Sequence, residues 1–410
     1  MTPVVILLLV ALVPAPTVSP PPRRASSTAV PSGQRCPNAS CPCSDARLCS
    51  AITRTGPEKA FVFHDGYAGD ELEWRQYDWT QISTISLGYS ISPQLLCHAH
   101  SLGVRVVRGI DFPPADQWDN DTAVSAYISD HVANMKSCHL DGFNLDVEVT
   151  DTPAQARSMV ALARRFTAAM HAAVPGSQVS FDVDSLAAPC SGNPTKPDYI
   201  YDVVGLAKAV DFLVVMDYDS ANNPAQQPFF KGPMALPLLK VGVEKFQQVG
   251  VPPSSLVLAM PWYGYEWIVD AGCSGNGTCP GAKEHHYLGI GSTGPKQLEG
   301  FTCRAGVYKM PGPFFFNLSC PSASGLLSHA SHGEEWDPWS QTPFLRYTDP
   351  HQGTAYEVWY ENQKSLALKY AYAKEVGVRG VGMWQANSIN YQNKSQVDGI
   401  WGSLRSFTGK

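Results

Sequence analysis

Charge is sparse in this sequence, and long apolar runs are almost absent from it. Only 16% of the 410 residues are charged, the formal net charge is −6, and the basic residues are scattered rather than gathered into a stripe. Such a distribution argues against a nucleic-acid partner. Beyond the N-terminus, no stretch stays apolar over the length of a membrane helix, so we expect no membrane partner. Hydrophobic residues still make up 44% of the chain, which is enough for a large core.

The N-terminus carries the one marked apolar run, at residues 4–13. It has the length of the hydrophobic region of a signal peptide and is too short to span a bilayer. We therefore interpret residues 1–27 as a signal peptide and Pro-rich leader whose cleavage site the sequence does not fix. Asn-X-Ser/Thr sequons support passage through the secretory route. They begin at Asn38, Asn120, Asn276, Asn317 and Asn393.

Cysteine is more abundant than in most intracellular chains, with eleven residues. Four of them, Cys36, Cys41, Cys43 and Cys49, crowd into a Cys-rich N-terminal segment at residues 28–57, as in disulfide frameworks of secreted proteins. A zinc site is the alternative interpretation of this cluster. The odd total leaves at least one cysteine free or paired elsewhere.

The sequence also lacks an internal repeat of fixed period and a Gly-rich phosphate turn after its first predicted strand. The missing turn argues against a doubly wound open sheet. Short apolar segments alternate with helical stretches, which indicates an α/β fold, a (β/α)8 TIM barrel at residues 58–410. The predicted strands are 60–63, 82–87, 104–107, 143–147, 179–183, 212–216, 256–260 and 381–384. The predicted helices are 93–102, 122–138, 153–173, 203–209, 236–249, 365–376 and 397–407.

One long segment, at about residues 266–361, interrupts this alternation between the seventh strand and the helix that follows it. It contains four cysteines, many aromatic residues and a strand-like stretch at 355–360. We interpret it as an inserted α+β segment beside the active-site face, where a barrel tolerates insertion.

The fourth predicted strand carries the strongest signal of chemistry. Alternate side chains of a strand share a face, so Asn144, Asp146 and Glu148 point one way and the apolar residues between them the other. Burying two carboxyls and an amide is costly unless they are paired or functional, and the alternative is a core patch with a basic partner. Repulsion and burial raise a carboxyl pKa, so we expect Glu148, nearest the mouth, to be a general acid with Asp146 as its partner.

Three further strand ends supply polar and aromatic candidates. Met216, Tyr218 and Asp219 end the sixth strand, where a Tyr hydroxyl can donate a hydrogen bond to a substrate carbonyl. Trp384 ends the eighth strand as either core filler or a floor for a sugar ring. Tyr263 lies after the seventh strand on the same rim, beside Trp262, for which core packing is the alternative.

These segments together resemble glycoside hydrolase family 18, the chitinase-like barrels. Residues 141–148 read Asp-Gly-Phe-Asn-Leu-Asp-Val-Glu, which matches the family's Asp-Gly-X-Asp-X-Asp-X-Glu except for Asn144. The Met-X-Tyr-Asp of strand six, the Met-Pro-X-Tyr-Gly of strand seven and the Trp of strand eight match residues 216–219, 260–264 and Trp384. The family's Ser-X-Gly-Gly of strand three is missing from residues 106–111, which weakens a plain chitinase assignment.

The resemblance implies substrate-assisted retaining hydrolysis without cofactor or metal. Glu148 would protonate the glycosidic oxygen while the substrate's N-acetyl carbonyl attacks the anomeric carbon. Asp146 would orient the acetamido N–H and Tyr218 its oxygen, while Asn144, Met216, Asp219, Tyr263 and Trp384 would bind substrate. We also expect Asn144 to hydrogen-bond Asp146 and to leave it ionised at lower pH.

Further local similarities within the family, including the Cys-Pro-Cys-Ser lead-in at residues 41–44, imply a narrower function. The expected substrate is the N,N'-diacetylchitobiose core of N-glycan fragments, cleaved at its β-1,4 bond by a monomeric lysosomal enzyme that enters through the secretory pathway. The alternatives are a chitinase, an endo-N-acetylglucosaminidase, or a catalytically silent glycan-binding lectin on the same barrel.

Overall fold

A computed structural model of the chain describes residues 36, 40–52, 58–64, 73–88, 92–149, 152–187, 200–219, 232–269, 296–298, 330–348, 353, 355–389, 391 and 394–409. The interpretation of residues 1–27, four of the five sequons, and Cys190, Cys273, Cys279, Cys303 and Cys320 fall outside these ranges. The fifth sequon begins at Asn120, which is exposed and caps a helix. Among the described helices, none is both long and apolar enough to cross a bilayer.

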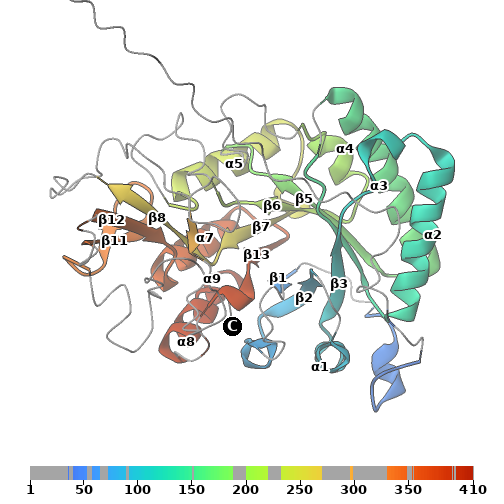
Figure 1. Cartoon of the computed structure of the whole chain (residues 1–410), viewed down its shortest axis with the longest axis horizontal. Coiled ribbons are helices and arrows are strands. Elements are labelled where there is room, and N and C mark those ends of the chain that lie inside the picture. The colour runs from blue at the N-terminus through green and yellow to red at the C-terminus, as the bar shows by residue number, and fades with distance from the viewer. Residues whose placement is uncertain are drawn as a thin grey trace, which may run out of the picture.

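Eight parallel strands close into a barrel, which confirms the predicted TIM barrel (Figure 1). Their order around the barrel is β1-β13-β7-β6-β5-β4-β3-β2, so neighbours in sequence are neighbours in space except where β13 follows β7. The strands are β1 (Ala60–His64), β2 (Ile82–Leu87), β3 (Arg105–Ile110), β4 (Gly142–Leu145), β5 (Gln178–Asp184), β6 (Phe212–Met216), β7 (Leu256–Pro261) and β13 (Gly380–Trp384).

Helices surround the barrel and begin where the sequence supplies caps. Side chains of Ser92, Asn120 and Thr152 accept hydrogen bonds from backbone N–H groups of α1, α2 and α3. The predicted closing helix at 397–407 is two helices. The helices are α1 (Pro93–Ser101), α2 (Asp121–Ser137), α3 (Pro153–Ala173), α4 (Val203–Ala207), α5 (Leu236–Gln248), α7 (Gln363–Glu375), α8 (Lys394–Ser403) and α9 (Arg405–Thr408).

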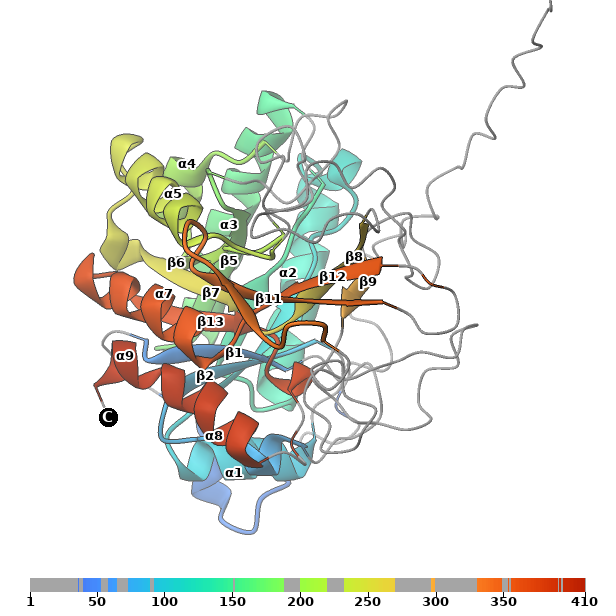
Figure 2. The same cartoon turned by 90° about the vertical axis from the view of Figure 1, so that its left-hand side faces the viewer.

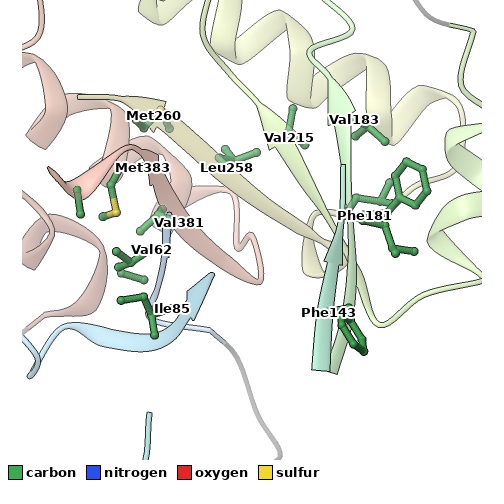
Figure 3. Packing of buried hydrophobic residues seen from close by; sticks show 14 of the residues in the cluster. Val62, Ile85, Phe143, Phe181, Val183, Val215, Leu258, Met260, Val381 and Met383 are labelled. Atoms are coloured by element: carbon green, nitrogen blue, oxygen red, sulfur yellow. The ribbon is translucent and has the colours of Figure 1, made fainter. Parts of the chain in front are cut away.

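The core has two layers, one between strands and helices and one inside the barrel. Figure 3 shows part of the outer layer, including Phe143, Phe181 and Val215. The inner layer contains Phe61, Phe212 and neighbouring apolar side chains. Phe143, like Leu145 and Val147, belongs to the outer layer, so the alternate positions of this segment face inward, as strand geometry predicts.

The long segment after β7 contains a second, antiparallel sheet beside the barrel (Figure 2). Its order is β10-β11-β12-β8-β9, with β8 (Gly264–Val269), β9 (Lys296–Leu298), β10 (Glu335–Asp337), β11 (Thr342–Thr348) and β12 (Ala355–Tyr360). The predicted strand at 355–360 is therefore confirmed. The chain returns to the barrel through Glu361, whose Oε1 lies 2.5 Å from Lys369 Nζ of α7, with both side chains fully buried.

Disulfides attach the Cys-rich segment to the barrel. They join Cys36 to Cys138, Cys41 to Cys49 and Cys43 to Cys97, the last of which lies on α1. The disulfide prediction is confirmed for these six residues. The zinc alternative for Cys41, Cys43 and Cys49 is wrong, because their sulfurs are close together but oxidised, and zinc binds thiolates.

Asp141 fixes the start of β4 and ties it to this segment. Its carboxylate accepts backbone N–H groups of Ile52 and Val106, each at 2.6 Å, and lies 2.8 Å from His100 Nε2. The other ring nitrogen of His100 lies 2.6 Å from the Leu48 carbonyl, which can only accept a hydrogen bond. Asp141, the first residue of the family motif, is thus structural.

Candidate active site

The motif carboxyls stand at the carboxyl end of the barrel, where TIM-barrel enzymes place their active sites. The strand β4 ends at Leu145, so Asp146 and Glu148 follow it rather than lie in it. The ladder continues one step, since Asp146 N–H donates to the Ile110 carbonyl at 2.9 Å. This bond keeps Asp146 in the register of the strand, above Asn144 on the inward face.

Glu148 lies in surroundings that favour its protonated form. Burial raises its pKa well above the usual range, and the charges of Asp146, Asp184, Asp219 and, more weakly, Asp111 raise it further. A carboxyl that keeps its proton near neutral pH can give it to a leaving oxygen. The raised pKa suits the role of general acid, which stays a prediction for Glu148.

Asp146 is surrounded by other acids as well. Burial raises its pKa to about 7, with smaller contributions from Asp111 and Asp184. Each of these causes is desolvation or a neighbouring carboxyl, so the pattern does not fit a core patch neutralised by a basic partner. One oxygen of Asp146, Oδ1, is buried and makes no hydrogen bond within the described part of the chain.

The expected hydrogen bond from Asn144 to Asp146 is wrong. Asn144 Nδ2 instead donates to Asp182 Oδ2 at 2.6 Å, and Asn144 Oδ1 accepts from Ser180 Oγ at 2.6 Å. Asn144 and Ser180 are paired residues of β4 and β5, so the inward-pointing amide of Asn144 hydrogen-bonds side chains of the neighbouring strand rather than the next residue along its own strand. Asn144 is only 1% exposed, which places it beneath the mouth rather than in contact with a ligand.

The end of β6 brings three predicted residues together with Tyr263. Met216 and Tyr218 belong to the inner layer, as does Tyr263, whose ring lies 6.3 Å from that of Tyr218. The Tyr263 hydroxyl donates a short hydrogen bond to Asp219 Oδ1. The backbone of Asp219 is in the left-handed region, with φ of 58°.

Trp384 and Trp262 differ in exposure, which distinguishes between core packing and a floor for a sugar ring. Trp384 is half-buried, and its ring packs edge-on against Phe63 at 5.3 Å, on top of the inner layer. Trp262 is 1% exposed, and its indole N–H donates to the Tyr370 hydroxyl at 3.0 Å. Trp262 is therefore core, whereas Trp384 keeps an accessible surface at the strand end.

The inserted sheet contributes a wall beside these residues. Phe344 of β11 and Trp359 of β12 are cross-strand partners whose rings stack at 4.7 Å, and both join the inner layer with Tyr263. Glu357 accepts hydrogen bonds from Trp359 Nε1 at 2.5 Å and from Arg346 Nε at 3.1 Å. The sheet is thus continuous with the packing of the inner layer, on the side of the barrel where the sequence analysis expects the insertion.

Sequence reasoning missed the acids of β5. Asp182 and Asp184 are 3% and 4% exposed and lie near the motif carboxyls. The charge of Asp184 raises the pKa of Glu148, and the charges of Asp146 and Glu148 raise the pKa of Asp182. A signal was present, because Ser180, Asp182 and Asp184 alternate with apolar residues in a predicted strand just as residues 144–148 do. Asp111, exposed just after β3, was missed too.

Comparisons with a family model and with curated proteins point to the same family. The family model "Glycosyl hydrolases family 18" matches residues 115–388. Di-N-acetylchitobiase of Rattus norvegicus is 32% identical over 373 residues, covering 89% of this chain and 92% of the relative. The Homo sapiens protein of the same name is 30% identical, covering 89% and 88%.

Solved structures with low sequence identity share the fold. A family 18 chitinase from Cycas revoluta in complex with (GlcNAc)3 superposes with a TM-score of 0.59 at 20% identity, covering 86% of this chain and 99% of that one. A chitinase from Chromobacterium violaceum gives 0.61 at 16% identity, covering 86% and 99%. With the family model and the full-length relatives, the conclusion is that this chain belongs to glycosyl hydrolases family 18 and is a glycoside hydrolase.

Proposed function

We propose that this enzyme hydrolyses the β-1,4 bond of the N,N'-diacetylchitobiose core of N-glycan fragments and releases the reducing-end N-acetylglucosamine. The observation that carries the proposal is the position of Glu148 at the barrel mouth close to Asp146, where burial and neighbouring carboxyls raise its pKa. The relatives named di-N-acetylchitobiase, which match nearly the whole chain, support the choice of substrate.

The proposed chemistry uses the substrate's own N-acetyl group as the nucleophile. Glu148 gives its proton to the glycosidic oxygen as the bond to the anomeric carbon breaks. The acetamido oxygen bonds to that carbon and forms a cyclic oxazolinium ion. Water then adds to the anomeric carbon with its proton passing to Glu148, which restores the acid and retains the configuration.

Two residues position the acetamido group in this mechanism. Asp146 accepts the acetamido N–H and offsets the positive charge that develops on the ring, and Tyr218 donates its hydroxyl proton to the acetamido oxygen. Of the predicted substrate-binding residues, Trp384 supplies a floor for the sugar, with Met216, Asp219 and Tyr263 shaping the rim. Asn144 supports Asp182 from below and does not touch the sugar.

We further propose that the enzyme works as a monomer in the lysosome, reached through the secretory pathway. Disulfides between the N-terminal segment and the barrel suit an oxidising route of synthesis. The raised pKa of Glu148 favours its protonated form in an acidic lumen. Size-exclusion chromatography and microscopy of the tagged full chain test these two points.

The decisive experiment incubates the purified protein with a glycan that ends in reducing chitobiose and identifies the released sugar. We expect one N-acetylglucosamine per glycan, and none with Glu148→Gln. Cleavage of long chitooligosaccharides at internal bonds would instead indicate a chitinase. Release of a glycan from an intact glycoprotein would indicate an endo-N-acetylglucosaminidase. Binding without turnover by the unmodified protein identifies a lectin.

A further inference from the structure

We propose that Asp182 is a neutral carboxylic acid that donates its proton in a hydrogen bond to Asp146, and so holds Asp146 in the ionised form that accepts the acetamido N–H. Asp182 is thus a positioning residue for the reaction, and the inference rests on the proposed function. It assigns a role to a buried acid that the family motif does not contain.

The strand register brings Asp182 to Asp146. Asn144 of β4 pairs with Ser180 of β5, and the next inward positions of these two parallel strands are Asp146 and Asp182. On its other side Asp182 pairs with Val214 of β6, which is fully buried and apolar. Since Asp182 is 3% exposed, water does not replace the missing partners on that side.

The hydrogen bonds around Asn144 decide which oxygen of Asp182 carries the proton. Ser180 Oγ donates to Asn144 Oδ1, and Asn144 Nδ2 donates to Asp182 Oδ2, both at 2.6 Å. In a neutral Asp182, the oxygen that accepts this amide hydrogen bond is the carbonyl oxygen, so the hydroxyl proton lies on Oδ1. The three side chains form one chain of donors that runs from Ser180 toward Asp182.

Asp182 and Asp146 each have one buried carboxyl oxygen that the hydrogen bonds around Asn144 do not reach. Asp182 Oδ1 and Asp146 Oδ1 are both inaccessible and make no hydrogen bond among the described residues. Two carboxylates cannot satisfy each other, whereas a carboxylic acid and a carboxylate can, through a single shared proton. A proton on Asp182 Oδ1 satisfies both atoms at once.

The charges around Asp182 favour its neutral form. Burial raises the pKa of Asp182 well above its usual range, the charges of Asp146 and Glu148 raise it as well, and only the Asn144 hydrogen bond lowers it. Donation from Asp182 in turn stabilises the charge of Asp146. The acids of the surrounding strands and strand ends are Asp111 after β3, Asp146 and Glu148 after β4, Asp184 on β5, and Asp217 and Asp219 after β6.

This arrangement explains why an amide rather than a carboxyl suits position 144. A carboxyl at position 144 would compete for the same proton, while an amide can only donate to Oδ2 and thereby directs the proton toward Asp146. Asp182 forms and breaks no bond to the substrate, and its proton stays on Oδ1 throughout.

Two substitutions of Asp182 test whether its role is to donate a hydrogen bond or to carry a negative charge. Asn at position 182 can still accept from Asn144 and donate to Asp146, so we expect Asp182→Asn to retain kcat within about threefold and to keep the acid limb of the pH profile. Asp182→Ala removes the donor, and we expect kcat to fall about 100-fold with a small change in KM, because the acetamido group is misplaced. Glu58→Gln, a buried acid at the other end of the barrel, is the control and should leave the pH profile unchanged.

Infrared spectroscopy detects the proton on Asp182 directly and does not require enzymatic activity. The difference spectrum between unmodified protein and Asp182→Asn near pH 6 should contain the C=O band of a protonated carboxyl, which Glu58→Gln does not remove. Absence of this band, loss of kcat in Asp182→Asn equal to that in Asp182→Ala, or full activity of Asp182→Ala overturns the proposal. If Asp182→Ala does not fold, the Asn variant and its spectrum still decide. An inert unmodified protein contradicts the proposed function alone, and the spectrum then still tests Asp182.

Discussion

The two ends of the barrel treat buried carboxyls in opposite ways. At the amino end, Asp141 meets His100 and two backbone N–H groups, and Glu58 accepts from Ser83 at 2.6 Å and lies 3.8 Å from Arg105. At the carboxyl end, Asp146, Glu148 and Asp182 lie among other acids, and burial raises the pKa of each. Basic partners offset the charges of the first group, whereas burial and neighbouring acids make the second group bind protons more tightly.

This difference separates stability from chemistry within one fold. A buried ion pair whose partners are both satisfied holds segments together and has no proton to give. A buried acid without a basic partner is costly to ionise, and that cost is what makes it a proton donor at the pH of its compartment. Substitutions at the two ends should therefore change different measurements.

The largest effect is expected from Glu148→Gln at the carboxyl end. The amide cannot supply a proton to the glycosidic oxygen, so we expect kcat on a chitobiose glycan to fall by about 10³-fold or more, with KM little changed. The thermal midpoint should rise or stay level, because a buried acid among other acids is removed. A variant with near-native turnover would remove Glu148 from the mechanism.

A smaller loss is expected from Asp146→Asn and from Tyr218→Phe. Each removes one of the two contacts that position the acetamido group, so we expect kcat to fall about 100-fold for either change. Both residues position the same acetamido group of the substrate, so the double variant should lose less than the product of the two effects. Strict multiplication of the two losses would show that the residues act independently.

At the amino end, His100→Gln should reduce stability and spare activity. It leaves the buried Asp141 without its charged partner, so we expect a loss of about 3 kcal/mol in the free energy of unfolding. Burial lowers the pKa of His100, but the hydrogen bond and charge of Asp141 and the Leu48 carbonyl raise it more, so the net shift is upward.

The sign of the pH dependence follows from that shift. A histidine whose pKa is raised in the folded state stabilises the fold fully below its unfolded pKa of about 6.5, and this contribution is lost as pH rises through the folded value. Denaturant titrations from pH 5 to 9 should therefore show a decline in the unmodified protein that His100→Gln lacks. Equal slopes in the two proteins would mean that His100 is not charged.

The smallest effect is expected from Asn144→Asp. A carboxyl placed 2.6 Å from Asp182 must share its proton, and the added acid raises the pKa values of the cluster. We expect the alkaline limb of the pH profile to move up by about one unit, with activity retained at acidic pH. A pH optimum that does not move would count against any electrostatic role of position 144.

Much of the fold could be predicted because alternation and period are local properties. The strands at 82–87 and 212–216 and the helix at 153–173 have the predicted bounds, since buried apolar runs and a capped amphipathic face specify them directly. The join at Leu404 was missed, because the break between α8 and α9 carries no glycine or proline. The disulfide partners were also out of reach, because pairing depends on where distant loops meet in space.

The sequence predicts site residues within a single strand but not the contacts between neighbouring strands. Asp146 and Glu148 follow from the spacing of a single segment, whereas Asn144 was assigned to the wrong partner because a strand's own alternation says nothing about its neighbour. Asp182 became visible once β4 and β5 were set in register. The stacked Phe344 and Trp359 likewise join the mouth only through the inserted sheet.

The central claim is that Glu148 is an acid whose partner nucleophile belongs to the substrate. The most direct test compares a chitobiose glycan with an analogue that carries a hydroxyl in place of the acetamido group on the sugar whose bond is broken, and follows the product anomer by proton NMR. We predict turnover of the first with retained β configuration and no turnover of the second. Hydrolysis of the analogue at a comparable rate, or an inverted product, would contradict the account.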